Sequence, residues 1–106
     1  MLDRFEFNNY LDENENPAGG YVRGVGLAID WQQGPLGTGD ERRAPNGAFV
    51  ETVTQAAIER IEFYQRSKFA CDENKLALKH LKLAVEAMQS RTKSRESRGV
   101  EGTHAK

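Results

Sequence analysis

Three arginines near the C-terminus have the spacing of an anion-binding row. Arg91, Arg95 and Arg98 follow one another at intervals of four and three residues, which places them on one side of an α-helix. Guanidinium groups bind phosphate oxygens through paired hydrogen bonds, so three converging forks would suit a phosphate-bearing ligand. The same row could instead be a solvated or salt-bridged basic helix end, which also favours the helix dipole. The spacing alone leaves both interpretations open.

A second group of residues has the chemistry of a purine site. Phe63, Tyr64 and Phe69 surround an expected turn between two helices, and Asn74 lies in the first helical turn after it. Aromatic rings can stack on a purine, and an amide can pair with its donor and acceptor edge. The alternative is structural, since aromatic residues at such a corner are usually part of a core. Trp31 raises the same choice, because its ring could cover a ligand or anchor a strand.

The remaining residues give no pattern of catalytic or metal-binding chemistry. Cys71 could have a lowered pKa near a helix N-terminus, but its spacing from His80 shows no arrangement of nucleophile and base. One cysteine and two histidines make no recognisable metal site, and no pair of carboxylates stands out. We therefore expect a protein that is not an enzyme and that uses no metal and no cofactor.

A single long helix must position the arginine row. Residues 72–98 contain neither glycine nor proline, Asp72 can cap the start, and Gly99 can end the helix in the left-handed conformation. A helical period puts the arginines in line with a predicted buried seam: Ala77, His80, Ala84, Ala87 and Met88. Leucines flank this seam on both sides, so the apolar arc is too wide for one partner helix. The pattern predicts an oligomer, in which carboxylates or a bound anion neutralise the arginines.

A second helix precedes the long one and completes a predicted hairpin. Asn46 can cap a helix that runs to about Arg66. The connector of residues 67–72 is short enough to make the two helices antiparallel neighbours. The packed face of the earlier helix is predicted from residues spaced three or four apart: Val50, Val53, Ala57, Ile61 and Tyr64.

A small β element is expected in front of the hairpin. Apolar residues alternate with small ones between residues 21 and 31, the period of one half-buried strand, which must pair with residues 3–10 or with a symmetry mate. The predicted fold class is α+β, with a small N-terminal antiparallel β element followed by a long antiparallel helical hairpin. We expect one domain, divided into a polar arm (1–20), a strand and glycine-rich loop (21–47), the hairpin (48–98) and a tail (99–106).

Charge is unevenly distributed along the 106 residues, although the net charge is only −1. Residues 1–65 hold 5 Lys/Arg and 11 Asp/Glu, whereas residues 66–106 hold 10 and 5. Such a division argues against a nucleic-acid binder, which would be basic more uniformly. A single cysteine fits a reducing compartment, and no apolar run is long enough for a signal peptide or a membrane span. We expect a cytoplasmic protein with no membrane partner.

The C-terminal half carries a recognisable motif. The segment RTKSRESRGVEGTH, from Arg91 to His104, resembles the most specific element of the phage anti-CBASS/Thoeris anti-defence hairpin-domain family. The preceding segments WQQGPLG, PNGAFVETV and RIEFYQ are similar to the part that leads into that hairpin, so the resemblance covers about residues 25 to 105. Departures from the family pattern include Asp72-Glu73 where many relatives have Arg-Glu.

The resemblance implies a non-catalytic sponge for cyclic nucleotide immune signals in the infected bacterial cytoplasm. The implied ligands are cyclic ADP-ribose isomers and cyclic di- or trinucleotides, held by a homo-oligomer that is a dimer or a larger assembly such as a hexamer. In that picture Arg91 and Arg95 hold phosphates, and Tyr64 with Asn74 holds the adenine across a subunit interface. Arg98, Phe63 and Trp31 complete the expected ligand-binding set.

A second hypothesis comes from a different class of protein. The chain could be a non-catalytic oligomeric structural or interaction protein of a phage, with no nucleotide ligand. Its arginine row would then pair with the acidic residues 12–15 or 40–41 of a neighbouring subunit.

Overall fold

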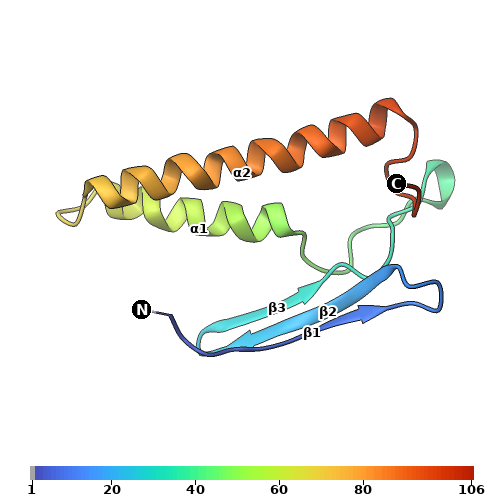
Figure 1. Cartoon of the computed structure of the whole chain (residues 1–106), viewed down its shortest axis with the longest axis horizontal. Coiled ribbons are helices and arrows are strands. Elements are labelled where there is room, and N and C mark those ends of the chain that lie inside the picture. Colours follow the sequence, from blue (N-terminus) through green and yellow to red (C-terminus); the bar gives the residue numbers. More distant parts are fainter. Residues whose placement is uncertain (1) are drawn as a thin grey trace. The chain divides into compact units, whose positions relative to one another are not determined.

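Strands come first and helices second along this chain, as the α+β prediction requires. The computed structural model describes residues 2–106, and Figure 1 follows them from the blue strands to the red end of the last helix. Two compact units form. We call residues up to 49 with 100–106 the sheet unit, and residues 50–99 the hairpin unit. The α+β class, the antiparallel β element and the helical hairpin are confirmed.

The sheet unit contains more strands than the sequence predicts. Its antiparallel sheet has the order β1-β2-β3, with β1 at Glu6–Leu11, β2 at Pro17–Gly24 and β3 at Leu27–Trp31. The prediction of one strand over residues 21–31 is wrong, because a two-residue turn at Val25 and Gly26 divides it. Val25 continues the apolar alternation through that turn, which hides the break. The predicted polar arm is also wrong for β1 and the start of β2, whereas the pairing with residues 3–10 is confirmed.

The register of the strands separates an apolar face from a polar one. Phe7 lies opposite Val22, and Val22 lies opposite Ile29, so these side chains share one face. On the other face Glu6 lies opposite Arg23. The sheet is therefore amphipathic, as expected for a small antiparallel sheet.

Gly20 allows β1 and β2 to approach each other. Its φ is 140°, and a Cβ atom built there would lie 2.2 Å from the backbone oxygen of Asn8. No other residue fits at this position without a shift of the backbone. The register of β1 and β2 also shifts just beyond it, between Asn9 and Leu11.

The glycine-rich loop after β3 contains a short 3₁₀ helix at Gly39–Glu41. Asn46, at the end of this loop, has a different role from the predicted one. Asn46 does not cap the next helix, which begins at Val50. Instead the backbone N–H of Asn46 donates to Gln32 Oε1, and its own Oδ1 accepts from the backbone N–H of Gln33, both at 2.8 Å. The amide ties the two ends of the loop together, a use that short-range capping rules do not anticipate.

The hairpin unit consists of α1 at Val50–Gln65 and α2 at Asp72–Ser97, which lie antiparallel in Figure 1. Gln65 closes the turn between them, because its amide donates to the backbone oxygen of Cys71 at 3.1 Å and accepts from its N–H at 3.0 Å. Cys71 is the N-cap of α2, so the prediction of Asp72 as the cap is wrong by one residue. Gly99 has a φ of 71°, as predicted for the end of this helix.

The two helices pack through a narrower stripe than the sequence predicts. Ile58 is the most buried apolar residue described, at 2% exposure. Half-buried residues of α2 recur at intervals of three and four: Leu78, Leu81, Val85 and Met88. The predicted seam is rotated by roughly 90° from this stripe, and its members His80, Ala84 and Ala87 are exposed. The apolar arc of α2 is so wide that periodicity could not show which part faces α1.

The packed face of α1 also differs from the prediction. Val53 and Ile61 are half-buried as expected, but Val50, Ala57 and Tyr64 are exposed. Ile58, the residue at the centre of the real face, was outside the predicted set.

Candidate ligand-binding site

Arg91 and Arg95 lie on a part of α2 that extends past α1, and Arg98 is the C-cap residue that follows this helix. α2 has 26 residues and α1 has 16, a difference of about 15 Å in length. Figure 1 shows the last turns of α2 continuing beyond the first turn of α1. Arg91 and Arg95 therefore lie outside the packed stripe of the two helices.

The three arginines differ in exposure. Arg91 and Arg98 are exposed, whereas Arg95 retains only 8% of its accessible surface. The expectation of one buried arginine seam is therefore corrected for Arg91 and Arg98. Arg95 and Arg98 also take part in interactions within the chain. Among these three arginines, Arg91 is the one that a ligand could contact most easily.

The aromatic group lies at the opposite end of the hairpin, near the turn. Phe63 is 50% exposed and Tyr64 is 36% exposed, and their ring centroids are 6.1 Å apart with an angle of 57° between the planes. Asn74 is half-buried in the first turn of α2. Both rings are thus partly open to solvent and are not buried in the core, unlike the structural alternative for aromatic corners.

Sequence reasoning missed Arg60, which lies over both rings. Its guanidinium carbon is 5.0 Å from the centroid of Phe63 and 4.9 Å from that of Tyr64. Its Nε also donates a hydrogen bond to the Tyr64 hydroxyl at 3.2 Å. The sequence signal was present, because residues three and four apart are neighbours on a helix surface.

The two predicted halves of the site are far apart within one chain. Asn74 and Arg91 lie on the same helix, 17 residues apart, which corresponds to about 26 Å along its axis. No cyclic mono- or dinucleotide spans that distance. A single hairpin can therefore offer an aromatic end or an arginine end to one ligand, but not both.

Trp31 belongs to the sheet unit. It is half-buried at the end of β3, where it lies opposite Gly20 and forms a parallel bridge with Ala48. A Cβ atom on Gly47 would lie 2.5 Å from the backbone of Trp31. These contacts fit the alternative in which Trp31 anchors a strand.

Glu101 and Gly102, near the end of the motif RTKSRESRGVEGTH, bind the glycine-rich loop. The Arg42 guanidinium forms a fork with Glu101, at 2.6 and 3.0 Å, and the N–H of Gly37 donates to the oxygen of Gly102 at 2.9 Å. A Cβ atom on Gly102 would lie 2.4 Å from the oxygen of Gly37. This part of the motif is explained by structure, so the motif as a whole is not a ligand signature.

The turn between β1 and β2 is closed by Asp12. Its Oδ1 accepts the backbone N–H groups of Asn14 at 2.8 Å and Asn16 at 3.0 Å, and His104 Nε2 lies 4.0 Å from its Oδ2. The hydrogen bond from the backbone of Asn16 is the main reason that the pKa of Asp12 is lowered.

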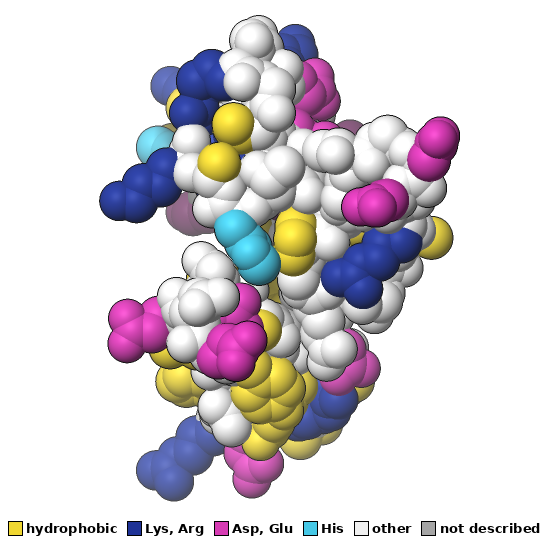
Figure 2. Space-filling view, turned by 90° about the vertical axis from the view of Figure 1, so that its right-hand side faces the viewer, with side chains coloured by type: hydrophobic (Ala, Val, Ile, Leu, Met, Phe, Trp, Pro, Cys, Tyr) yellow, Lys and Arg dark blue, Asp and Glu magenta, His cyan; other side chains and the backbone are white. Residues whose placement is uncertain are grey.

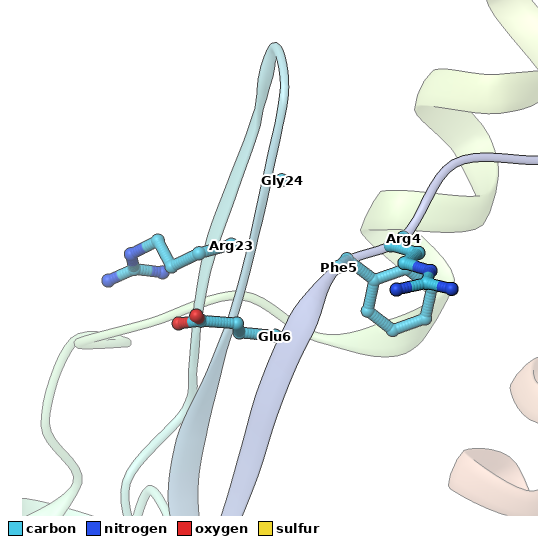
Figure 3. Close-up of a pocket in the computed structure, with 5 residues that line it drawn as sticks. All are labelled: Arg4, Phe5, Glu6, Arg23 and Gly24. Carbon is cyan, nitrogen blue, oxygen red and sulfur yellow. The ribbon is translucent and has the colours of Figure 1, made fainter.

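Grooves along the hairpin have an acidic lining that does not suit a phosphate, and a hollow on the sheet has a lining of mixed charge. Two grooves, of about 310 and 400 Å³, share Gln55, Val85 and Gln89 and are lined by several glutamates: Glu51, Glu59, Glu62 and Glu86. The hollow in Figure 3, about 570 Å³, is lined by Arg4, Glu6 and Arg23. Arg23 points the same way as Glu6 and also pairs with Asp30 at 2.5 Å, so carboxylates compensate its charge.

No group of three or more His, Cys, Asp or Glu side chains in residues 2–106 could hold a metal ion. None of the described helices combines the length and apolar character that crossing a membrane requires.

Comparison with known proteins shows to which family the hairpin belongs. "Thoeris anti-defense 1" of Bacillus phage SBSphiJ7 is 37% identical over 78 residues, which are 74% of this chain and 52% of that protein. The chain thus spans about half the length of this relative. Residues 24–93 match the family described as "Acb2/Tad1, hairpin domain", a range that includes Tyr64, Asn74 and Arg91. The chain therefore belongs to the Acb2/Tad1 hairpin-domain family.

Proposed function

We propose that this protein is a phage anti-defence protein that binds and sequesters a cyclic nucleotide immune signal without degrading it. The observation that carries the proposal is the exposed Arg91 on the projecting end of α2, next in the row to the buried Arg95. A fork of donors on a helix that extends beyond its partner can reach a phosphate from outside the chain. The name of the relative from Bacillus phage SBSphiJ7 supports the anti-defence role.

The proposed ligands are cyclic ADP-ribose isomers and cyclic di- or trinucleotides. Each combines a purine with phosphate, and the hairpin unit carries rings at one end and arginines at the other. We place no catalytic residue in this site, so bound ligand should be released unchanged. The proposed setting is the cytoplasm of the infected bacterial cell.

A second copy of the chain would bring the two ends together. Leu76 and Leu83 are 55% and 50% exposed at a seven-residue interval, and the small Ala84 and Ala87 beside them are also exposed. A second α2 packed antiparallel on this strip, crossing near Leu83 at a shallow angle, would place its Asn74 level with Thr92. The adenine contact of one subunit and the phosphate contact of the other would then share one ligand.

Isothermal titration with cyclic ADP-ribose isomers and with cyclic di- and trinucleotides tests the proposal. Arg91→Ala should weaken binding at least about 30-fold, because it removes a charge-assisted fork from the ligand. The double substitution Lys79→Ala with Lys93→Ala removes two positive charges from the opposite side of α2 and should leave binding within about twofold. Ligand recovered after heat denaturation should have its original mass. If no compound in the panel binds the wild-type protein, the proposed function is wrong.

The structural or interaction function is a second candidate because so little of the chain is buried. Among the described residues Ile58 is the one apolar side chain that is almost fully buried, and large apolar side chains are exposed in both units. Figure 2 shows yellow hydrophobic side chains open on one face. If the chain is an interaction protein, the double substitution Arg91→Ala with Arg95→Ala should dissociate the oligomer. If the chain is a cyclic nucleotide sponge, the same variant should remain oligomeric and lose its ligand.

A further inference from the structure

Arg60 is the feature of the hairpin unit that the proposed function does not yet use. It lies on α1 three residues before Phe63 and four before Tyr64, so all three side chains share one side of the helix. Its guanidinium carbon lies within about 5 Å of both ring centroids, at 5.0 and 4.9 Å. That is the geometry of a cation–π contact with two rings at once.

The hydrogen bond from Arg60 occupies the Tyr64 hydroxyl as an acceptor and orients the ring. Because Nε of Arg60 donates to the hydroxyl oxygen at 3.2 Å, the Tyr64 O–H is left to donate elsewhere. The ring is also held in place before a ligand arrives. Ordering a free side chain on binding costs conformational entropy, and a ring that is already held avoids that loss.

Arg60 also keeps its positive charge available. It is exposed, and within residues 2–106 no carboxylate lies within ion-pair distance of its guanidinium. Its one hydrogen bond uses Nε. Both terminal NH₂ groups can therefore meet an anionic oxygen beside a base stacked on Tyr64.

We infer that Arg60 is a specificity residue of the aromatic end, which holds the Tyr64 ring in place and selects purines that carry phosphate over uncharged purine nucleosides. The inference rests on the proposed function, since it assigns a second cation to the same ligand. It adds a requirement that the arginine row does not supply, because it places a positive charge beside the base.

The test compares two substitutions that remove the same charge from the same helix end. Arg60→Gln removes the guanidinium from the rings, whereas Arg66→Gln removes an exposed charge that contacts neither ring. Cyclic ADP-ribose and cyclic di-AMP are titrated into each variant, with adenosine as the uncharged probe. Circular dichroism confirms that each variant is folded, as expected for two exposed positions.

Arg60→Gln should weaken binding of the cyclic nucleotide roughly tenfold, and it should change adenosine binding by less than about threefold. Arg66→Gln should change both by less than about threefold. In a Tyr64→Phe background the effect of Arg60→Gln should shrink, because the hydrogen bond between the two side chains is already lost.

Three results would overturn the inference. One is cyclic nucleotide binding that is unchanged in Arg60→Gln, and another is an equal loss in Arg66→Gln, which would indicate a general effect of net charge. Either would leave the proposed function intact. Failure of the wild-type protein to bind either cyclic nucleotide would remove the proposed function together with the inference.

Discussion

Arg91 and Arg95 are neighbours in sequence spacing but differ in what each side chain does. Arg91 is exposed, so its replacement leaves no cavity and removes only the donor that we propose for the ligand. Arg95 is 8% exposed and interacts within the chain, so its loss leaves its partners unsatisfied. The two residues should therefore separate binding from stability.

This difference gives a prediction at the level of single residues. Arg95→Ala should lower the free energy of unfolding by about 2–4 kcal/mol, the range for losing hydrogen bonds to a charged, largely buried group. Arg91→Ala should change it by less than about 0.5 kcal/mol. Urea unfolding followed by circular dichroism measures both, and equal destabilisation by the two variants would contradict the assigned roles.

Ile58 should contribute most to the stability of the hairpin unit among its apolar residues. Ile58→Ala should lower the free energy of unfolding by about 2–4 kcal/mol, because it removes buried methyl groups and leaves a cavity. Val50→Ala at the exposed start of α1 is the matched control and should have an effect below about 0.5 kcal/mol. A similar loss in both variants would show that the centre of the packing lies elsewhere.

Asp12 makes stability depend on acidic pH. Its pKa is lowered mainly by the hydrogen bond from the backbone of Asn16, so the folded chain favours the charged carboxylate. A lowered pKa stabilises the fold above the ordinary value of about 3.9, and this contribution is lost as the pH falls through the folded-state pKa. Asp12→Asn should therefore lose less stability than the wild type between pH 5 and pH 2, in thermal melts at each pH. Parallel pH profiles would contradict this role.

At the level of secondary-structure elements, two hydrogen bonds from one side chain close the turn of the hairpin. Gln65 is half-buried and uses both ends of its amide on the backbone of Cys71. Gln65→Ala should lower the free energy of unfolding by about 1–2 kcal/mol, because two backbone groups lose their partner. Gln55→Ala is the control, since Gln55 is exposed and bonds only to Glu59 at 3.3 Å. Equal effects would mean that the turn is closed without Gln65.

The helices were easier to predict than the strands for physical reasons. Long stretches without glycine or proline predict the bounds of α1 and α2 to within a few residues, and an arc of leucines strengthens the prediction for α2. β1 contains Asn8 and Asn9 and is exposed along its whole length, so no apolar period marks it. The start of α1 was placed too early because Asn46 had the chemistry of a cap but bonds across the loop instead.

The candidate site could be predicted only in part. Arginine spacing placed Arg91 and Arg95 on one side of α2, with Arg98 at its C-cap, but the exposure of each depends on tertiary packing. Arg60 was missed because its spacing of three and four residues from Phe63 and Tyr64 is common on helices and does not by itself indicate a contact. The distance of about 26 Å between Asn74 and Arg91 becomes meaningful only once α2 is known to be continuous.

At the level of the whole molecule, the exposed strip on α2 predicts self-association. Leu76→Lys with Leu83→Lys should reduce the mass of the assembly, because it places charges in a strip that a second copy would cover. Val25→Lys changes an equally apolar, more exposed side chain in the β2–β3 turn and should leave the assembly unchanged. Size-exclusion chromatography with light scattering measures the mass, and a wild-type monomer would contradict the prediction.

A crystal structure of the protein with a bound cyclic ADP-ribose isomer or cyclic dinucleotide would show whether Arg91 holds the phosphate. We expect a phosphate oxygen about 2.7–2.9 Å from the Arg91 guanidinium and a purine stacked on Tyr64 of a second subunit. A ligand bound away from the end of α2, with Arg91 pointing into solvent, would contradict this expectation.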